Sequence, residues 1–250
     1  MKIIKNGEYK MNLMTEFKKI KRTGLAETFL AGGILSALVP VLNTALRTEM
    51  FVGQQGNPFE ILINGNWQII AMLNVLLVVA GSSIIYNIEY SNNAVQKTET
   101  LPINSFSVFL GKFTILSIFS ILNIAIETIS LVFCVKKWFD ERQFESTEVL
   151  KFFGISVLFT FTAVFLMMLV AKYCKNMWVC LGTGVLFVLF ATVLGNENLY
   201  FSMFPFALPF ETIFGNSDKE MLQLIVASVS ECGIFIVAEL ILNKIRRNVQ

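Results

Sequence analysis

Residues 67–88 read WQIIAMLNVLLVVAGSSIIYNI, a stretch of the chain without a charged side chain. The hydrocarbon core of a bilayer is roughly 30 Å thick, and about 20 helical residues cross it. A run this long and this apolar is typical of a transmembrane helix. With five further apolar runs, we expect six spanning helices: residues 24–46, 67–88, 106–135, 150–171, 177–194 and 221–243. The predicted fold is a single all-α membrane domain over residues 1–250.

The composition supports the same class of protein. Of the 250 residues, 55% are hydrophobic, 24 are Phe and only 15% are charged, whereas a soluble domain carries about 25% charged residues. The formal net charge of +2 is too small to indicate nucleic acid as a partner. We therefore expect a lipid bilayer around the chain and no nucleic-acid partner.

The basic residues predict the orientation in the membrane. Most of the twenty Lys and Arg residues fall on one side if both ends of the chain lie inside the cell, and basic residues near helix ends resist translocation. We predict a multi-pass protein of the bacterial cell membrane with both termini in the cytoplasm. The first apolar run follows a basic stretch and is expected to be retained, and Met11 and Met14 are alternative starts.

Residues 1–23 predict an amphipathic helix at the inner membrane surface. Leu13, Phe17 and Ile20 recur at helical spacing, and basic residues fill the positions between them. Such a helix lies in the interface with its apolar face toward the lipid. The predicted interfacial residues are Phe17, Lys18, Lys19, Lys21 and Arg22. The alternative is a solvated basic tail.

Two connections between the spans have contrasting composition. Residues 47–66 contain turn-forming residues and predict an exposed outer loop. Residues 89–105 begin polar and continue with Leu101, Pro102 and Ile103. Because proline suits the first turn of a helix, we predict a short cytoplasmic helix, a break, and then the third span.

Residues 195–220 are unusual for an outer connection because they are rich in Phe and Leu. Pro205 and Pro209 interrupt the segment, so one straight spanning helix is excluded. We predict a re-entrant or interfacial pair of short helices on the outer side. The alternative is an aromatic belt that caps the helix at 177–194.

Several classes of chemistry are absent from the sequence. Without histidine, no His-dependent triad or His-based zinc motif can form. No P-loop and no dinucleotide fingerprint occurs. The four cysteines form no Cys-x-x-Cys pair and are expected to be free thiols. We therefore predict no catalytic, cofactor or metal site in this chain.

Three glutamates fall within the predicted spans. An ionisable side chain in a membrane is costly and often marks a pathway or a paired group. Glu127 and Glu231 are candidates for a substrate path, and the alternative is a structural role in interhelical hydrogen bonding. No Lys or Arg lies in the middle of a span, so no cationic partner at depth is expected. Glu239 is expected to reach water at the inner interface.

The predicted order of elements resembles that of the permease subunits of ABC-2 type exporters. Residues 16–23, EFKKIKRT, are similar to the opening motif of the permeases for lantibiotic immunity and resistance, the MutG- and SpaG-like group. Glu89, the segment TETLPINS at 98–105, and Gly111 with Lys112 are similar to the coupling segment of that group.

The resemblance implies a division of labour between subunits. A separate ATPase would bind ATP and dock on the N-terminal helix and the coupling segment, at Glu89, Glu99, Leu101, Pro102 and Ile103. A second permease, identical or related, would complete the path, and the cargo would be a cationic antimicrobial peptide. Two alternatives remain: a permease for another drug, lipid or peptide, and a membrane scaffold or sensor subunit that does not transport.

Overall fold

A computed structural model describes residues 13–21, 23–91, 105–139, 145–194 and 199–249. In these ranges there is no strand, and five helices are long and apolar enough to cross a membrane. They are α2 (Leu25–Leu46), α4 (Pro58–Ser91), α6 (Ser105–Trp138), α7 (Ser146–Tyr173) and α10 (Asp218–Val249). A sixth apolar helix, α8 (Met177–Leu194), is shorter. The remaining elements are α1 (Leu13–Ile20), α3 (Thr48–Val52), α9 (Leu199–Ser202) and the 3₁₀ turn η2 (Leu208–Phe210). The predicted all-α class is confirmed.

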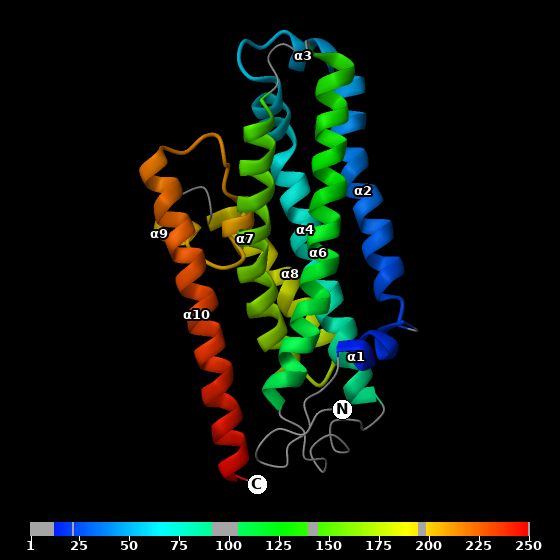
Figure 1. Cartoon of the computed structure of the whole chain (residues 1–250), viewed down its shortest axis with the longest axis vertical. Helices are drawn as coiled ribbons and strands as arrows, with labels where there is room; N and C mark the ends of the chain where they lie inside the picture. The colour runs from blue at the N-terminus through cyan, green and yellow to red at the C-terminus, as the bar shows by residue number, and fades with distance from the viewer. Residues whose placement is uncertain (1–12, 22, 92–104, 140–144, 195–198, 250) are drawn as a thin grey trace.

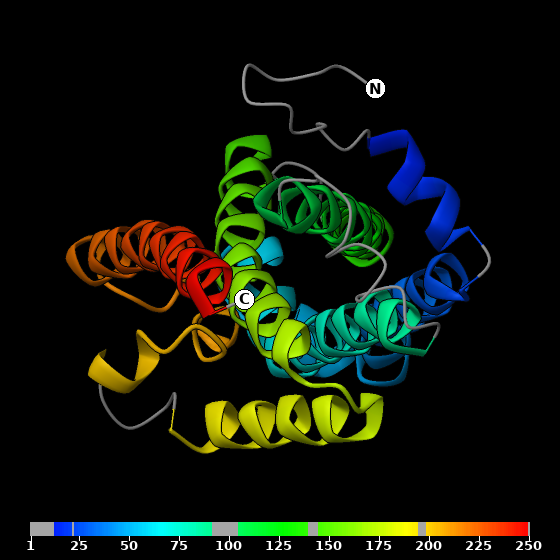
Figure 2. The ribbon, with the colours of Figure 1, turned by 90° about the horizontal axis from the view of Figure 1, so that it is seen from below.

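The long helices run side by side in one elongated bundle (Figure 1). Helix α4 packs against α2, α6, α7 and α8, and so occupies the centre. Helix α10 packs mainly against α7 and stands at the edge of the bundle, as Figure 2 shows. We call the end that carries α1 the α1 end and the end that carries α3 the α3 end. The C-terminal part of α10 lies at the α1 end (Figure 1).

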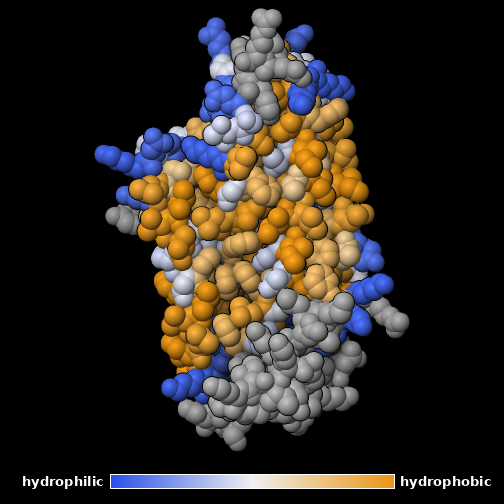
Figure 3. Space-filling model, viewed as in Figure 1, coloured by the Kyte–Doolittle hydropathy of each residue, from blue (hydrophilic) through white to orange (hydrophobic). Residues whose placement is uncertain are grey.

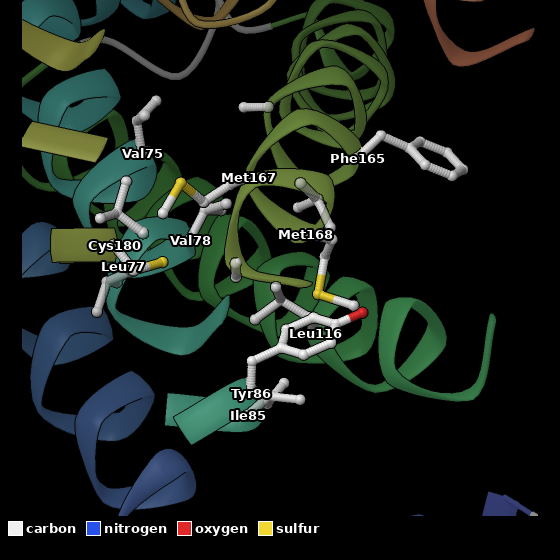
Figure 4. Close-up of a cluster of buried hydrophobic side chains, with 14 of the residues drawn as sticks. Val75, Leu77, Val78, Ile85, Tyr86, Leu116, Phe165, Met167, Met168 and Cys180 are labelled. Atoms are coloured by element: carbon white, nitrogen blue, oxygen red, sulfur yellow. The ribbon is translucent and has the colours of Figure 1, made fainter. Parts of the chain in front are cut away.

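Two clusters of buried apolar side chains hold the bundle together. One joins α4, α6 and α7 through residues such as Val78, Leu116 and Met168 (Figure 4). The other lies toward the α3 end, where the rings of Phe59 and Phe152 meet edge to face with centroids 5.7 Å apart. In lipid, close van der Waals packing stabilises such contacts, because the surrounding acyl chains are equally apolar.

The surface of the bundle is apolar in the middle and hydrophilic toward both ends (Figure 3). Exposed apolar side chains follow α2, α8 and α10 in particular, for example Leu35, Leu189 and Val229. Such a large exposed apolar surface is unusual for a protein in water. It is the surface expected of a protein surrounded by lipid.

Helix α4 begins earlier than the sequence predicted. It starts at Pro58 and not at residue 67, so the predicted outer loop over 47–66 is reduced to α3 and a short turn. Pro58 occupies the first helical position, and Asn57 Oδ1 accepts a hydrogen bond from the Phe59 amide at 2.9 Å. The additional turns persist because Phe59 and Ile63 are buried in the cluster at the α3 end.

The segment before α10 packs into the bundle. The described part, residues 199–217, contains α9 and η2, and η2 lies against α4 and α7. Phe206 and Leu208 are buried, Thr162 donates a hydrogen bond to the Pro205 carbonyl at 3.1 Å, and Phe206 meets the ring of Phe187 on α8 with centroids 5.3 Å apart. This apolar segment is therefore covered by protein on several sides and also contacts α8.

Two glycines on α8 offer a matched test of its packing. A Cβ at Gly184 would lie 2.3 Å from Val79 Cγ1 on α4, whereas a Cβ at Gly182 would meet no atom within 4 Å. Because the buried Val79 side chain has little rotamer freedom, Gly184→Ala is expected to destabilise the protein by about 1–3 kcal/mol. Gly182→Ala is expected to be neutral or slightly stabilising. Thermal unfolding in detergent measures both, and equal melting temperatures would contradict the α4–α8 contact.

Candidate functional site

Helix α1 docks on α6 with one face and leaves the other exposed. Glu16 and Ile20 are buried, with Glu16 only 2% exposed. A Cβ at Gly111 would lie 3.6 Å from Glu16 Cγ, so the two helices approach closely at this point. Phe17 is 40% exposed, and Lys18, Lys19 and Lys21 are exposed too. The exposed side thus combines an apolar ring with basic groups, while Arg22 lies outside the described residues.

A buried ion pair joins α4 and α6 at the α1 end. Lys112 Nζ lies 2.5 Å from Glu89 Oε1 and 4.2 Å from the centre of the Tyr86 ring. Lys112 is only 1% exposed, so its charge is balanced by the carboxylate and the ring face and not by water. Glu89 and Lys112 flank the connection 92–104. The ion pair therefore fixes the two helix ends from which that connection starts and to which it returns.

A second buried ion pair joins α7 and α10. Lys172 Nζ donates to Glu239 Oε1 at 2.6 Å and to Asn243 Oδ1 at 2.7 Å. Glu239 is fully buried, so the prediction that it reaches interfacial water is wrong. The expectation that the glutamates have no cationic partner is wrong for Glu239 as well. The reason is that α7 continues to Tyr173 and carries Lys172 into the bundle beside α10.

Glu127 lies in a polar cluster between α2, α4 and α6. Its carboxylate accepts hydrogen bonds from Asn74 Nδ2 at 2.8 Å and from Asn123 Nδ2 at 3.1 Å, and Asn123 also donates to Asn74 Oδ1. Glu127 is 1% exposed. On α2 a Cβ at Gly33 would lie 2.5 Å from Asn123 Oδ1, so a larger residue at this position would displace the amide. These contacts are typical of an interhelical polar network.

Glu231 is in a different environment from Glu127. It lies on α10, is half-buried, and its Oε2 atom is buried without a hydrogen-bond partner among the described residues. Among the described residues, no hydrogen bond connects Glu231 with the cluster around Glu127. Within the described ranges, no group of three His, Cys, Asp or Glu side chains is arranged to hold a metal ion.

The predicted coupling residues fall partly within the described chain. Glu89 is described and is paired with Lys112, whereas Glu99, Leu101, Pro102 and Ile103 lie outside the described residues. The partner of Glu89 was missed by sequence reasoning. A signal was available, because opposite charges at the two ends of a helix–helix connection come close when the helices pack as neighbours. No comparable local signal linked Lys172 to Glu239.

The comparisons with known proteins add one finding. The model of the family described as ABC-2 family transporter protein matches residues 12–195, which is more than half of the chain. No curated protein and no solved structure matches the sequence or the fold. The matched range runs from α1 to the end of α8 and includes both helices that flank the connection 92–104.

Proposed function

Since the chain belongs to the ABC-2 family of transporter membrane proteins, we propose that it is the permease of an exporter for lantibiotic-like cationic peptides. The family consists of membrane permeases without an ATPase domain, and membership implies a separate ABC ATPase as partner. The chain is thus a transporter subunit and not an enzyme. In the proposed exporter, the permease removes the peptide from the cell membrane and confers immunity or resistance.

The observation that supports the lantibiotic-immunity group and its contact with an ATPase is the meeting of two motif segments. Residues 16–23 and 111–112 resemble the corresponding motifs of lantibiotic immunity permeases, and Glu16 on α1 packs beside Gly111 on α6. Segments far apart in the sequence thus form one surface at the α1 end. This shared surface supports the proposal that both motif segments contact the ATPase.

We propose that the ATPase docks at this surface and on the connection 92–104. The contacts would come from Glu99, Leu101, Pro102 and Ile103, together with the exposed basic side of α1. Glu89 would act indirectly, since its carboxylate is paired with Lys112 and holds the end of α4 in place. ATP would be bound by the partner, and only a contact that differs between the two ATPase states can drive a change in the permease.

The proposed topology has six spans with both termini in the cytoplasm. Helix α8 would be the sixth span, since its 18 residues extend about 27 Å, close to the roughly 30 Å hydrocarbon core. An even number of crossings places α1 and the end of α10 on the same side, as their position in the bundle supports. The segment 195–220 would then be re-entrant from the outer side.

The path for the peptide would be completed by a second permease, identical or related. The negative charge of the path would come from Glu127 and Glu231 of this chain, which suit a cationic cargo. Of the two, Glu231 is the better placed to meet a ligand, because it is half-buried and lacks a partner within the described residues, whereas Glu127 is already hydrogen-bonded by two amides.

The decisive experiment combines resistance with subunit association. Co-expression of the permease and the neighbouring ATPase in a sensitive host is expected to raise resistance to nisin-like peptides and to allow co-purification of the pair. Leu101→Ala with Glu99→Ala is expected to reduce co-purification severalfold, because the docking contacts are lost. The matched control is Glu60→Ala at the α3 end, which is expected to leave the association unchanged.

Two results would contradict the proposal. Resistance that persists when the ATP site of the partner is mutated would indicate a scaffold or sensor that does not transport. Co-purification without any peptide resistance would indicate an ABC-2 permease with another drug, lipid or peptide as cargo.

A further inference from the structure

The polar contacts at the α1 end connect four helices in a closed circuit. The pair Glu89–Lys112 joins α4 to α6, and the pair Lys172–Glu239 joins α7 to α10. The other two connections in the circuit are hydrogen bonds. The Tyr90 hydroxyl donates to the backbone carbonyl of residue 172 and joins α4 to α7, and the Ser105 hydroxyl donates to Asn243 Oδ1 at 3.3 Å and joins α6 to α10.

Lys172 occupies the central position in this circuit. Its ammonium group donates to both Glu239 and Asn243 on α10, and its carbonyl accepts the Tyr90 hydroxyl from α4. Asn243 Nδ2 in turn donates to Glu239 Oε1 at 2.9 Å. One residue therefore links the end of α4, from which the connection 92–104 starts, to the edge helix α10.

Helix α10 depends on these contacts more than the other helices do. It is the least buried of the five long helices and packs mainly against α7. Its apolar side chains are largely exposed, for example Val229, Ile234 and Val237. Few packing contacts restrain it, so a buried and hydrogen-bonded ion pair at one end has a large influence on where that end lies.

A buried ion pair is suited to transmit a displacement. When two charges are enclosed in a medium of low dielectric constant, separating them leaves each one uncompensated. The pair therefore has two stable states. In one the two groups are in contact, in the other they are separated and both are hydrated, and intermediate separations are unfavourable. A helix attached through such a pair follows its partner until the pair opens.

We propose that Lys172, Glu239 and Asn243 are positioning residues of the transport cycle that transmit the movement of the connection 92–104 to α10. This rests on the proposed docking of the ATPase on that connection. Movement of the ends of α4 and α6 reaches α7 through Tyr90 and Lys172, and reaches α10 through the ion pair. Helix α10 thereby changes its position at the α1 end when the ATPase binds ATP.

The test uses the full permease with its ATPase in lipid nanodiscs. Spin labels at Leu110→Cys on α6 and Ile245→Cys on α10, both exposed positions, report the distance between the two helices, with the four native cysteines replaced by alanine. The key variant is Lys172→Met with Glu239→Met. It leaves no uncompensated buried charge and is therefore expected to fold.

In the wild type, an ATP analogue is expected to change the 110–245 distance. In the double methionine variant the ATPase is expected to bind normally, while the effect of the analogue on that distance falls about tenfold or more. The charge swap Lys172→Glu with Glu239→Lys is expected to recover most of the effect. Lys151→Met, the same substitution at the other end of α7, is the control and is expected to behave as wild type.

An unchanged response to the analogue in the double methionine variant would overturn the inference, because the ion pair would then serve stability alone. The readout does not depend on the cargo. A permease that shows the response and loses it in the variant, yet gives no resistance to peptides, would support the inference and contradict only the proposed substrate.

Discussion

Glu89→Ala is expected to lower the free energy of unfolding by about 3–5 kcal/mol, because it leaves a buried ammonium group without its carboxylate. Lys112 is almost completely enclosed, and the Tyr86 ring alone offers about 2 kcal/mol of cation–π stabilisation. Chemical unfolding of the purified protein in detergent measures the loss.

The double variant Glu89→Gln with Lys112→Met separates the effect of charge from that of packing. It removes both charges and is expected to recover most of the lost stability. Glu60→Ala, on the same helix at the α3 end, is the matched control, because Glu60 has no ion pair among the described residues. A loss for Glu60→Ala as large as that for Glu89→Ala would contradict the assignment of the buried pair.

The second large effect is expected for Glu127→Leu. The substitution removes the acceptor of two amide groups, on the partly buried Asn74 and the buried Asn123, and an unsatisfied buried amide costs about 1–3 kcal/mol. Stability and resistance to peptides are therefore expected to fall together. Thermal unfolding and the amount of folded protein in the membrane measure the first, and growth in the presence of peptide measures the second.

Glu231→Leu is the matched comparison, since the same carboxyl group is removed from another predicted span. Glu231 has no hydrogen-bond partner for its buried Oε2 atom within the described residues, so its removal is expected to be neutral or stabilising. A selective loss of resistance in this variant would place Glu231 in the peptide path. If Glu127→Leu kept full stability but lost resistance, the structural role of Glu127 would be refuted.

Most of the fold was predictable because membrane insertion is a local property. The runs at 67–88 and 177–194 are apolar over the width of a bilayer, and the structure has helices there. The extension of α4 to Pro58 was missed, since that stretch contains Asn64 and Asn66 and is less apolar by itself. Packing of Phe59 and Ile63 against other helices stabilises these additional turns.

The candidate site was predictable only in part. Glu127 was recognised as an unusual residue in a span, but its two amide partners come from α4 and from the preceding turn of α6. Lys112 was singled out only as part of the segment that resembles the coupling motif, and Lys172 was not singled out at all. Both are in fact buried, because neighbouring helices continue past them and supply carboxylates.

The amino-acid sequence alone thus determined that this is a helical membrane protein with the motifs of an ABC-2 permease, since hydropathy and short motifs are carried by consecutive residues. Only the tertiary structure decided which charges are paired, that α10 is attached through Lys172, and that Glu127 is enclosed. Pairing depends on how helices distant in the chain are packed side by side, and a buried charge is tolerated only where that packing brings its partner.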